Sequence, residues 1–73
     1  MNEQDIYKHI AKTIRLLRMK SNLSQEALSL KSGLNRAYVG HIERGYKRPT
    51  IETLKKISNA LDVPISQLFE GYK

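Results

Sequence analysis

The chain has 73 residues and carries 13 lysines and arginines against 7 acidic residues, so its formal net charge is +6. This balance favours a polyanionic partner such as nucleic acid, although an acidic protein or a membrane surface would also satisfy it. The short length predicts a single domain over residues 1–73 with a modest core, and the absence of cysteine excludes disulfides and thiolate zinc sites.

The N-terminal region predicts a helix that begins after Asn2 and ends near Ser21 and Asn22. Asn2 is a favourable N-cap, and the acidic residues Glu3 and Asp5 of the opening turn complement the helix dipole. The apolar face of this helix carries Ile6, Ile10, Ile14 and Leu17. The basic residues that lie off this face are Lys8, Lys12 and Arg15. No apolar run is long enough to span a bilayer and the N-terminus has no apolar signal core, so we expect a cytoplasmic protein with no membrane partner.

Two short helices joined by a tight turn are predicted between Ser24 and Gly45. Ser24 and Asn35 are N-caps, because their side-chain oxygens can accept hydrogen bonds from the free amides of a helix start. Each cap stands between a pair of apolar residues at the spacing of a hydrophobic staple: Leu23 with Leu28, and Leu34 with Val39. Gly33 can take the left-handed conformation that ends the first helix. Two helices with so short a connection cross at a steep angle.

The second helix of this pair, residues 35–44, has an outer face of small, basic and hydrogen-bonding residues: Arg36, Ala37, Gly40, His41 and Arg44. Arg36 near a helix start opposes the dipole, and a glycine in a helix interior costs about 1 kcal/mol relative to alanine. One interpretation is that both residues simply lie on a solvated face. On a basic chain we favour a second interpretation, in which Arg36 reaches a guanine edge and Gly40 lets a base come close.

The remainder of the chain predicts a basic loop and two more helices. The loop contains Tyr46, Lys47 and Arg48. After Pro49 and Thr50, the residues Ile51, Leu54, Ile57 and Leu61 recur at helical spacing. Ser66 then has the character of a cap for a last short helix, about residues 67–71. The sequence therefore predicts an all-α fold, a compact bundle of five helices.

Four segments together resemble the Cro- and phage-repressor-like (Xre-type) helix-turn-helix family. They are LSQEAL at 23–28, SGLNRAYVGHIERG at 32–45, PTIETLKKISNAL at 49–61 and DVPISQLF at 62–69. Arginine, a small residue and an aromatic at 36–38 are similar to the controller proteins of restriction-modification systems. The resemblance implies a lambda-repressor-like fold with its motif at about 24–44, and a transcriptional regulator, such as a repressor, that binds double-stranded DNA with helix 35–44 in the major groove.

The resemblance also implies roles for individual residues. The residues implied to face DNA bases are Arg36, Ala37, Gly40 and His41. The residues implied to contact phosphates are Gln25, Asn35, Tyr38, Arg44, Lys47 and Arg48. Ala37 can offer only a methyl contact, for example to thymine, and Tyr38 could instead pack on the helix edge. Arg18 and Glu43 match positions that form an ion pair, the alternative being that Arg18 reaches phosphate.

A homodimer is expected, because one recognition helix reads too few base pairs to select a site in a genome. The apolar residues near the C-terminus exceed what one small core is expected to absorb, which makes part of this set the candidate interface: Val63, Ile65, Leu68 and Phe69. The alternative is that all four complete the core of the single chain. A dimer should bind a near-palindrome with half-sites about 34 Å apart.

Other functions fit the sequence less well. An antitoxin that represses its own operon is a variant of the regulator, and a protein-interaction module with the same fold would make the basic surface incidental. No catalytic set, glycine-rich phosphate loop or paired-carboxylate site is recognisable, so we do not expect an enzyme. His9 and His41 are too far apart for a metal-ligand spacing, and we expect no metal, no cofactor and no small-molecule ligand.

Overall fold

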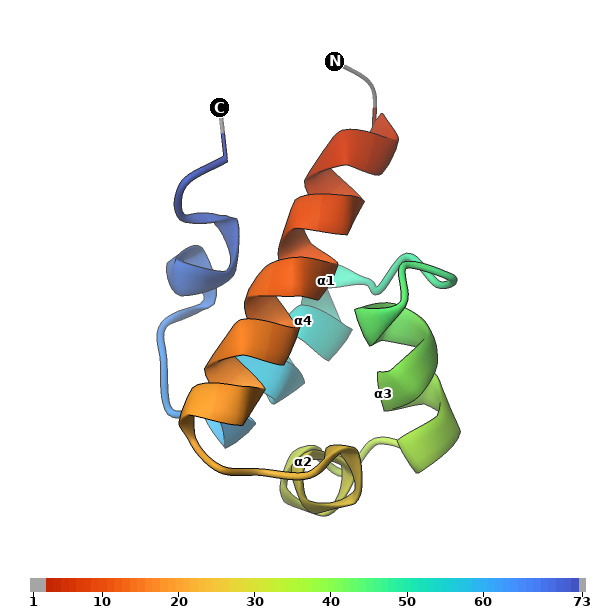
Figure 1. Cartoon of the computed structure of the whole chain (residues 1–73), viewed down its shortest axis with the longest axis vertical. Coiled ribbons are helices and arrows are strands. Elements are labelled where there is room, and N and C mark those ends of the chain that lie inside the picture. Colours follow the sequence, from red (N-terminus) through yellow and green to blue (C-terminus); the bar gives the residue numbers. More distant parts are fainter. Residues whose placement is uncertain (1–2, 73) are drawn as a thin grey trace.

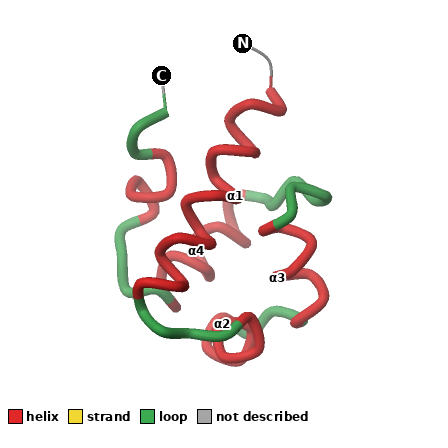
Figure 2. Tube along the Cα trace, viewed as in Figure 1, coloured by secondary structure: helices red, strands yellow, loops and turns green. Residues whose placement is uncertain are grey.

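The computed structural model describes residues 3–72 and builds that part of the chain from helices and loops alone. It contains the α-helices α1 (Glu3–Lys20), α2 (Gln25–Ser32), α3 (Arg36–Glu43) and α4 (Ile51–Ala60), and the short 3₁₀ helix η1 (Ile65–Phe69). Helix α1 runs along the length of the molecule in front of α4, α2 lies across one end, and α3 forms one flank (Figure 1). The connections are short, as the tube along the chain shows (Figure 2). The all-α prediction is confirmed for the described residues.

The predicted caps of α2 and α3 are confirmed. Ser24 Oγ accepts a hydrogen bond from the Ala27 amide at 3.0 Å, and Asn35 Oδ1 accepts from the Ala37 amide at 2.8 Å. Gly33 ends α2 with a φ of 75°, a left-handed conformation that costs glycine little. These local features set the turn that holds α3 against α2. The predicted cap Asn2 lies outside the described residues.

The prediction of five α-helices is wrong at the C-terminal end, because the described residues form four α-helices and one 3₁₀ helix. The last element is a 3₁₀ helix that begins at Ile65, and the residue before it, Pro64, makes no side-chain capping bond. Ser66 therefore lies inside the element instead of capping it. The bonds from the Gln67 amide to the Pro64 carbonyl and from the Glu70 amide to the Gln67 carbonyl span three residues, the spacing of a 3₁₀ turn.

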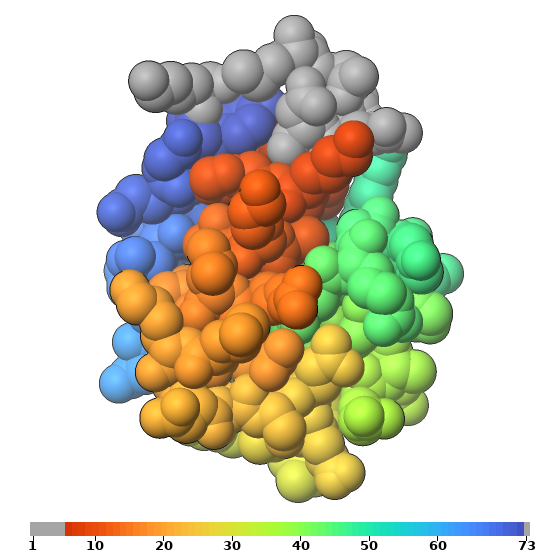
Figure 3. Space-filling model, viewed as in Figure 1, coloured from red at the N-terminus to blue at the C-terminus, as the bar shows by residue number. Residues whose placement is uncertain are grey.

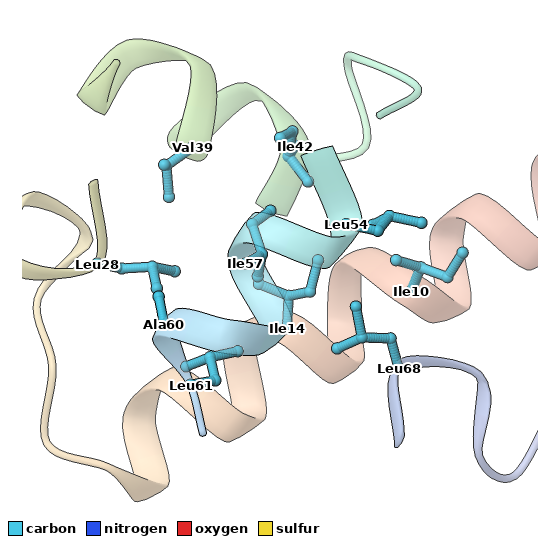
Figure 4. Close-up of a cluster of buried hydrophobic side chains, with 10 residues drawn as sticks. All are labelled: Ile10, Ile14, Leu28, Val39, Ile42, Leu54, Ile57, Ala60, Leu61 and Leu68. Carbon is cyan, nitrogen blue, oxygen red and sulfur yellow. The ribbon is translucent and has the colours of Figure 1, made fainter. Parts of the chain in front are cut away.

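The core brings together apolar residues from all five elements (Figure 4). Its members are Ile10, Ile14, Leu28, Val39, Ile42, Leu54, Ile57, Ala60, Leu61 and Leu68. Leu68 is fully inaccessible, so its assignment to a dimer interface is wrong: it completes the core of its own chain. Val63, Ile65 and Phe69 are only partly buried against that core. Among the described residues, no helix has the length and apolar character needed to cross a membrane.

Candidate nucleic-acid interface

The outer face of α3 begins with two exposed residues, Arg36 and Ala37. Val39 and Ile42, on the opposite side of the same helix, are buried in the core and fix its orientation. Tyr38 is half-buried and its side chain packs against the core. The first turn of α3 therefore exposes the guanidinium of Arg36 and the methyl group of Ala37 to solvent, on a helix whose other side packs in the core.

Gly40 does not present an open surface, contrary to the expectation that a base approaches it. The residue is buried, and a Cβ atom built on it would lie 3.3 Å from Arg44 Nη1 and 3.5 Å from Gln25 Oε1. The side chains of Arg44 and Gln25 thus occupy the space beside the glycine. The glycine gives room to these two side chains. Arg44 is a neighbour one helical turn further along the chain, whereas Gln25 comes from α2, and its place beside Gly40 could not be predicted from the local sequence.

His41 is half-buried at the far end of the same face. Its ring centroid lies 6.0 Å from that of Tyr46, and its Nδ1 is buried without a hydrogen-bond partner in the described part of the chain. The ring is therefore set against the loop that follows α3. Its contribution to an outer face is smaller than that of Arg36.

A largely buried ion pair ties α1 to α3. Arg18 Nε donates to Glu43 Oε2 at 2.7 Å and Arg18 Nη2 donates to Glu43 Oε1 at 3.1 Å, with the side chains 13% and 2% exposed. Arg18 Nη1 also donates to the Leu23 carbonyl at 2.7 Å. Gln25 Nε2, at the start of α2, donates to Glu43 Oε1 at 3.2 Å. One carboxylate therefore joins three helices, and Arg18 points into the protein.

Cations and hydrogen-bond donors flank α3 on both sides. Arg44 is exposed and its guanidinium lies 5.3 Å from the centroid of the Tyr46 ring. Lys47 and Arg48 are exposed in the loop that follows, and the guanidinium of Arg48 lies 5.6 Å from the Tyr7 ring centroid. On the other side, Asn35 is exposed. Its side-chain oxygen Oδ1 accepts the capping hydrogen bond, which leaves its side-chain NH₂ group as a donor.

One residue near this surface was not among the candidates from the sequence. Arg15 of α1 lines a polar hollow of about 300 Å³ together with Arg18, Gln25, Glu43 and Arg44. Arg15 stands three residues before Arg18, so both lie on one side of α1. That spacing was the available signal, once Arg18 was placed against α3. The described residues contain no cluster of histidine and acidic side chains that could hold a metal ion.

Comparisons with known proteins agree with this geometry. The helix-turn-helix family model HTH_3 matches residues 14–68. Control protein C.SmaI of Serratia marcescens is 39% identical over 64 residues, which cover 88% of this chain and 76% of that protein. The HTH-type transcriptional regulator SlrR of Bacillus subtilis is 37% identical over 63 residues, which cover 85% of this chain. The match spans only 41% of SlrR.

Solved structures give the same relationship. The restriction-modification controller protein C.AhdI from Aeromonas hydrophila superposes with a TM-score of 0.84 at 38% identity, covering 86% of this chain and 96% of that one. The controller protein C.Esp1396I, solved as a tetramer in complex with its natural 35 base-pair operator, gives a TM-score of 0.83 at 32% identity. That match covers 89% of this chain and 86% of that chain.

Proposed function

The chain belongs to the helix-turn-helix family, and from this premise we propose that it is a transcriptional regulator that binds specific sequences of double-stranded DNA. The exposed start of α3, which carries Arg36 and Ala37 and has exposed cations beside it, is the observation that carries the proposal. An α-helix of this kind fits the major groove, where base edges can be distinguished. The motif, at about residues 24–44, lies within a single DNA-binding domain.

We assign the residues on and beside α3 either to contacts with DNA bases or to contacts with phosphates. We assign Arg36 to a guanine edge, because its forked donors suit a bidentate contact, and Ala37 to a thymine methyl group. His41 stays a base-contact candidate at the edge of the face, whereas Gly40 is withdrawn because side chains cover it. Phosphate contacts are assigned to residues that carry hydrogen-bond donors within α3 or beside it: Gln25, Asn35, Tyr38, Arg44, Lys47 and Arg48.

We also propose that the regulated genes belong to a restriction-modification operon. The support is the likeness to control protein C.SmaI, at 39% identity, and to the restriction-modification controller protein C.AhdI, at 38% identity. A regulator of bacterial operators acts in the cytoplasm, and we place this protein there.

A second copy of the chain is the partner that completes the DNA-binding unit, as the tetramer of C.Esp1396I on its operator suggests. An apolar groove of about 410 Å³ is the surface that we assign to it. The groove is lined by Ile6, Tyr7, Ile10, Pro49, Thr50, Ile51, Leu54 and Phe69. Among the side chains that the structure describes, none that lines the groove is charged, so two copies that each carry +6 can meet there with little local repulsion. Ile51 at its edge is 68% exposed and would be covered by the partner.

The base-reading role of Arg36 is tested by comparing Arg36→Ala with Arg36→Lys. Alanine should lose about 1 to 3 kcal/mol of binding free energy on the best DNA site and much less on random DNA. Lysine keeps the charge but not the forked geometry, so it should retain most binding to random DNA and still lose specificity. Fluorescence anisotropy with both DNAs measures these affinities. Equal losses on the two DNAs for both variants would remove Arg36 from base reading.

A further inference from the structure

The hollow that contains Arg15 lies where three helices meet. Arg15 and Arg18 come from α1, Gln25 from α2, and Glu43 and Arg44 from the end of α3. In the space-filling view the second half of α1, in orange, lies beside α2 in yellow and α3 in green (Figure 3). The hollow therefore opens next to the proposed DNA-binding helix, and α1 forms one of its walls.

The charges in the hollow do not cancel. Three arginines face one carboxylate, which leaves two positive charges in excess. Glu43 is already satisfied, because Arg18 donates to both of its oxygens and Gln25 donates to one of them. Arg18 donates a third hydrogen bond, from Nη1, to the Leu23 carbonyl. The excess charge therefore belongs to Arg15 and Arg44.

These two arginines differ in how the protein holds them. The Arg44 guanidinium is placed beside Gly40 and over the Tyr46 ring, so its position is defined by the fold. Arg15 is exposed and has no hydrogen bond or ion pair with the described residues. An arginine that is brought to a cationic hollow without an acidic partner raises the local repulsion, which an external anion would relieve.

We propose that this hollow binds one phosphate of the DNA backbone, with Arg15 and Arg44 on either side of it. This inference rests on the proposed function and extends the DNA-binding surface to α1, outside the two-helix motif. Guanidinium groups suit a phosphate because each can donate two parallel hydrogen bonds to its oxygens. The carboxylate of Glu43 does not oppose the anion, because Arg18 and Gln25 cover both of its oxygens. Arg15 contributes affinity without sequence information.

The charge of Arg15 is tested by Arg15→Gln, with Lys20→Gln as the matched control. Lys20 is an exposed cation on the same helix, and five residues along α1 place it about 140° around the helix axis from Arg15. Arg15→Gln should lower the slope of log affinity against log salt by about one unit on both specific and random DNA. Lys20→Gln should leave the slope unchanged. Circular dichroism melting checks that both variants fold as the wild type does.

The site itself is tested with a set of operators that each carry one neutral methylphosphonate in the backbone. At one position in each half-site, the neutral group should cost the wild type more affinity than it costs Arg15→Gln, because the substitution has already removed one of the two arginine contacts to that phosphate. The inference about Arg15 would be overturned, with the proposed function left standing, if Arg15→Gln lost as much affinity as the wild type at every methylphosphonate position. The same holds if Arg15→Gln kept the full slope of log affinity against log salt. A wild type that binds no DNA would overturn the proposed function with it.

Discussion

Replacing Arg18 by methionine should lower the free energy of unfolding by about 3 to 5 kcal/mol, the cost of leaving one member of a buried ion pair without its partner. The Glu43 side chain is only 2% exposed, so water cannot replace the two hydrogen bonds that Arg18 supplies. Lys12→Met, which removes an exposed cation from the same helix, should change the stability by less than about 0.5 kcal/mol. Urea unfolding of both variants measures the difference.

The double variant Arg18→Met with Glu43→Leu separates the pair from its surroundings. Removing both charges leaves no buried ion, so the double variant should be more stable than Arg18→Met alone. The coupling energy from the cycle should be well above the roughly 0.5 kcal/mol within which independent sites add. A coupling energy of zero would mean that the ion pair between Arg18 and Glu43 contributes nothing to stability.

Replacing Ile51 by aspartate should convert the proposed dimer to a monomer, because the proposed interface would then bury an unpaired carboxylate. Sedimentation equilibrium at micromolar concentration measures the change in mass. Leu30→Asp is the matched control, since Leu30 is a hydrophobic residue on α2 that is 79% exposed and lies outside the groove. Both variants should still fold and show a cooperative thermal melting transition, because neither Ile51 nor Leu30 belongs to the core.

The same variants connect assembly to DNA binding. A monomer reads one half-site, so Ile51→Asp should bind the full operator with an affinity close to that for random DNA, while Leu30→Asp should keep the wild-type preference. A wild type that stays monomeric at every concentration, alone and on DNA, would contradict the dimer. An Ile51→Asp protein that remains dimeric would place the interface elsewhere.

The sequence predicted the features of this structure that depend on neighbouring residues. Ser24, Asn35 and Gly33 act on amides and carbonyls within a few positions of themselves, so their roles can be read along the chain. The apolar residues of α1 and α4 recur at helical spacing, which indicates the buried face whatever it packs against.

Each feature that sequence reasoning missed depends on at least one side chain or element from a distant position in the chain. Gly40 reads as an opening for a base until Arg44 and Gln25 are seen to fill the space beside it. The sequence left open whether Leu68 lies at a dimer interface or in the core, and the packing of its turn against α1 and α4 places it in the core. Arg15 reads as an ordinary solvated cation until α3 brings Arg44 to the same hollow. In each case the tertiary arrangement, not the local pattern, decides the role.

Selection of bound sequences from a random pool of double-stranded DNA tests the proposed function most directly. A dimer that places one α3 helix in each of two successive major grooves should enrich a near-palindrome with half-sites about 34 Å apart, roughly ten base pairs of B-DNA. Each half-site should contain a guanine whose preference disappears when the selection is repeated with Arg36→Ala. A pool that shows no enrichment after repeated rounds, although the protein is folded and binds at low salt, would contradict sequence-specific recognition.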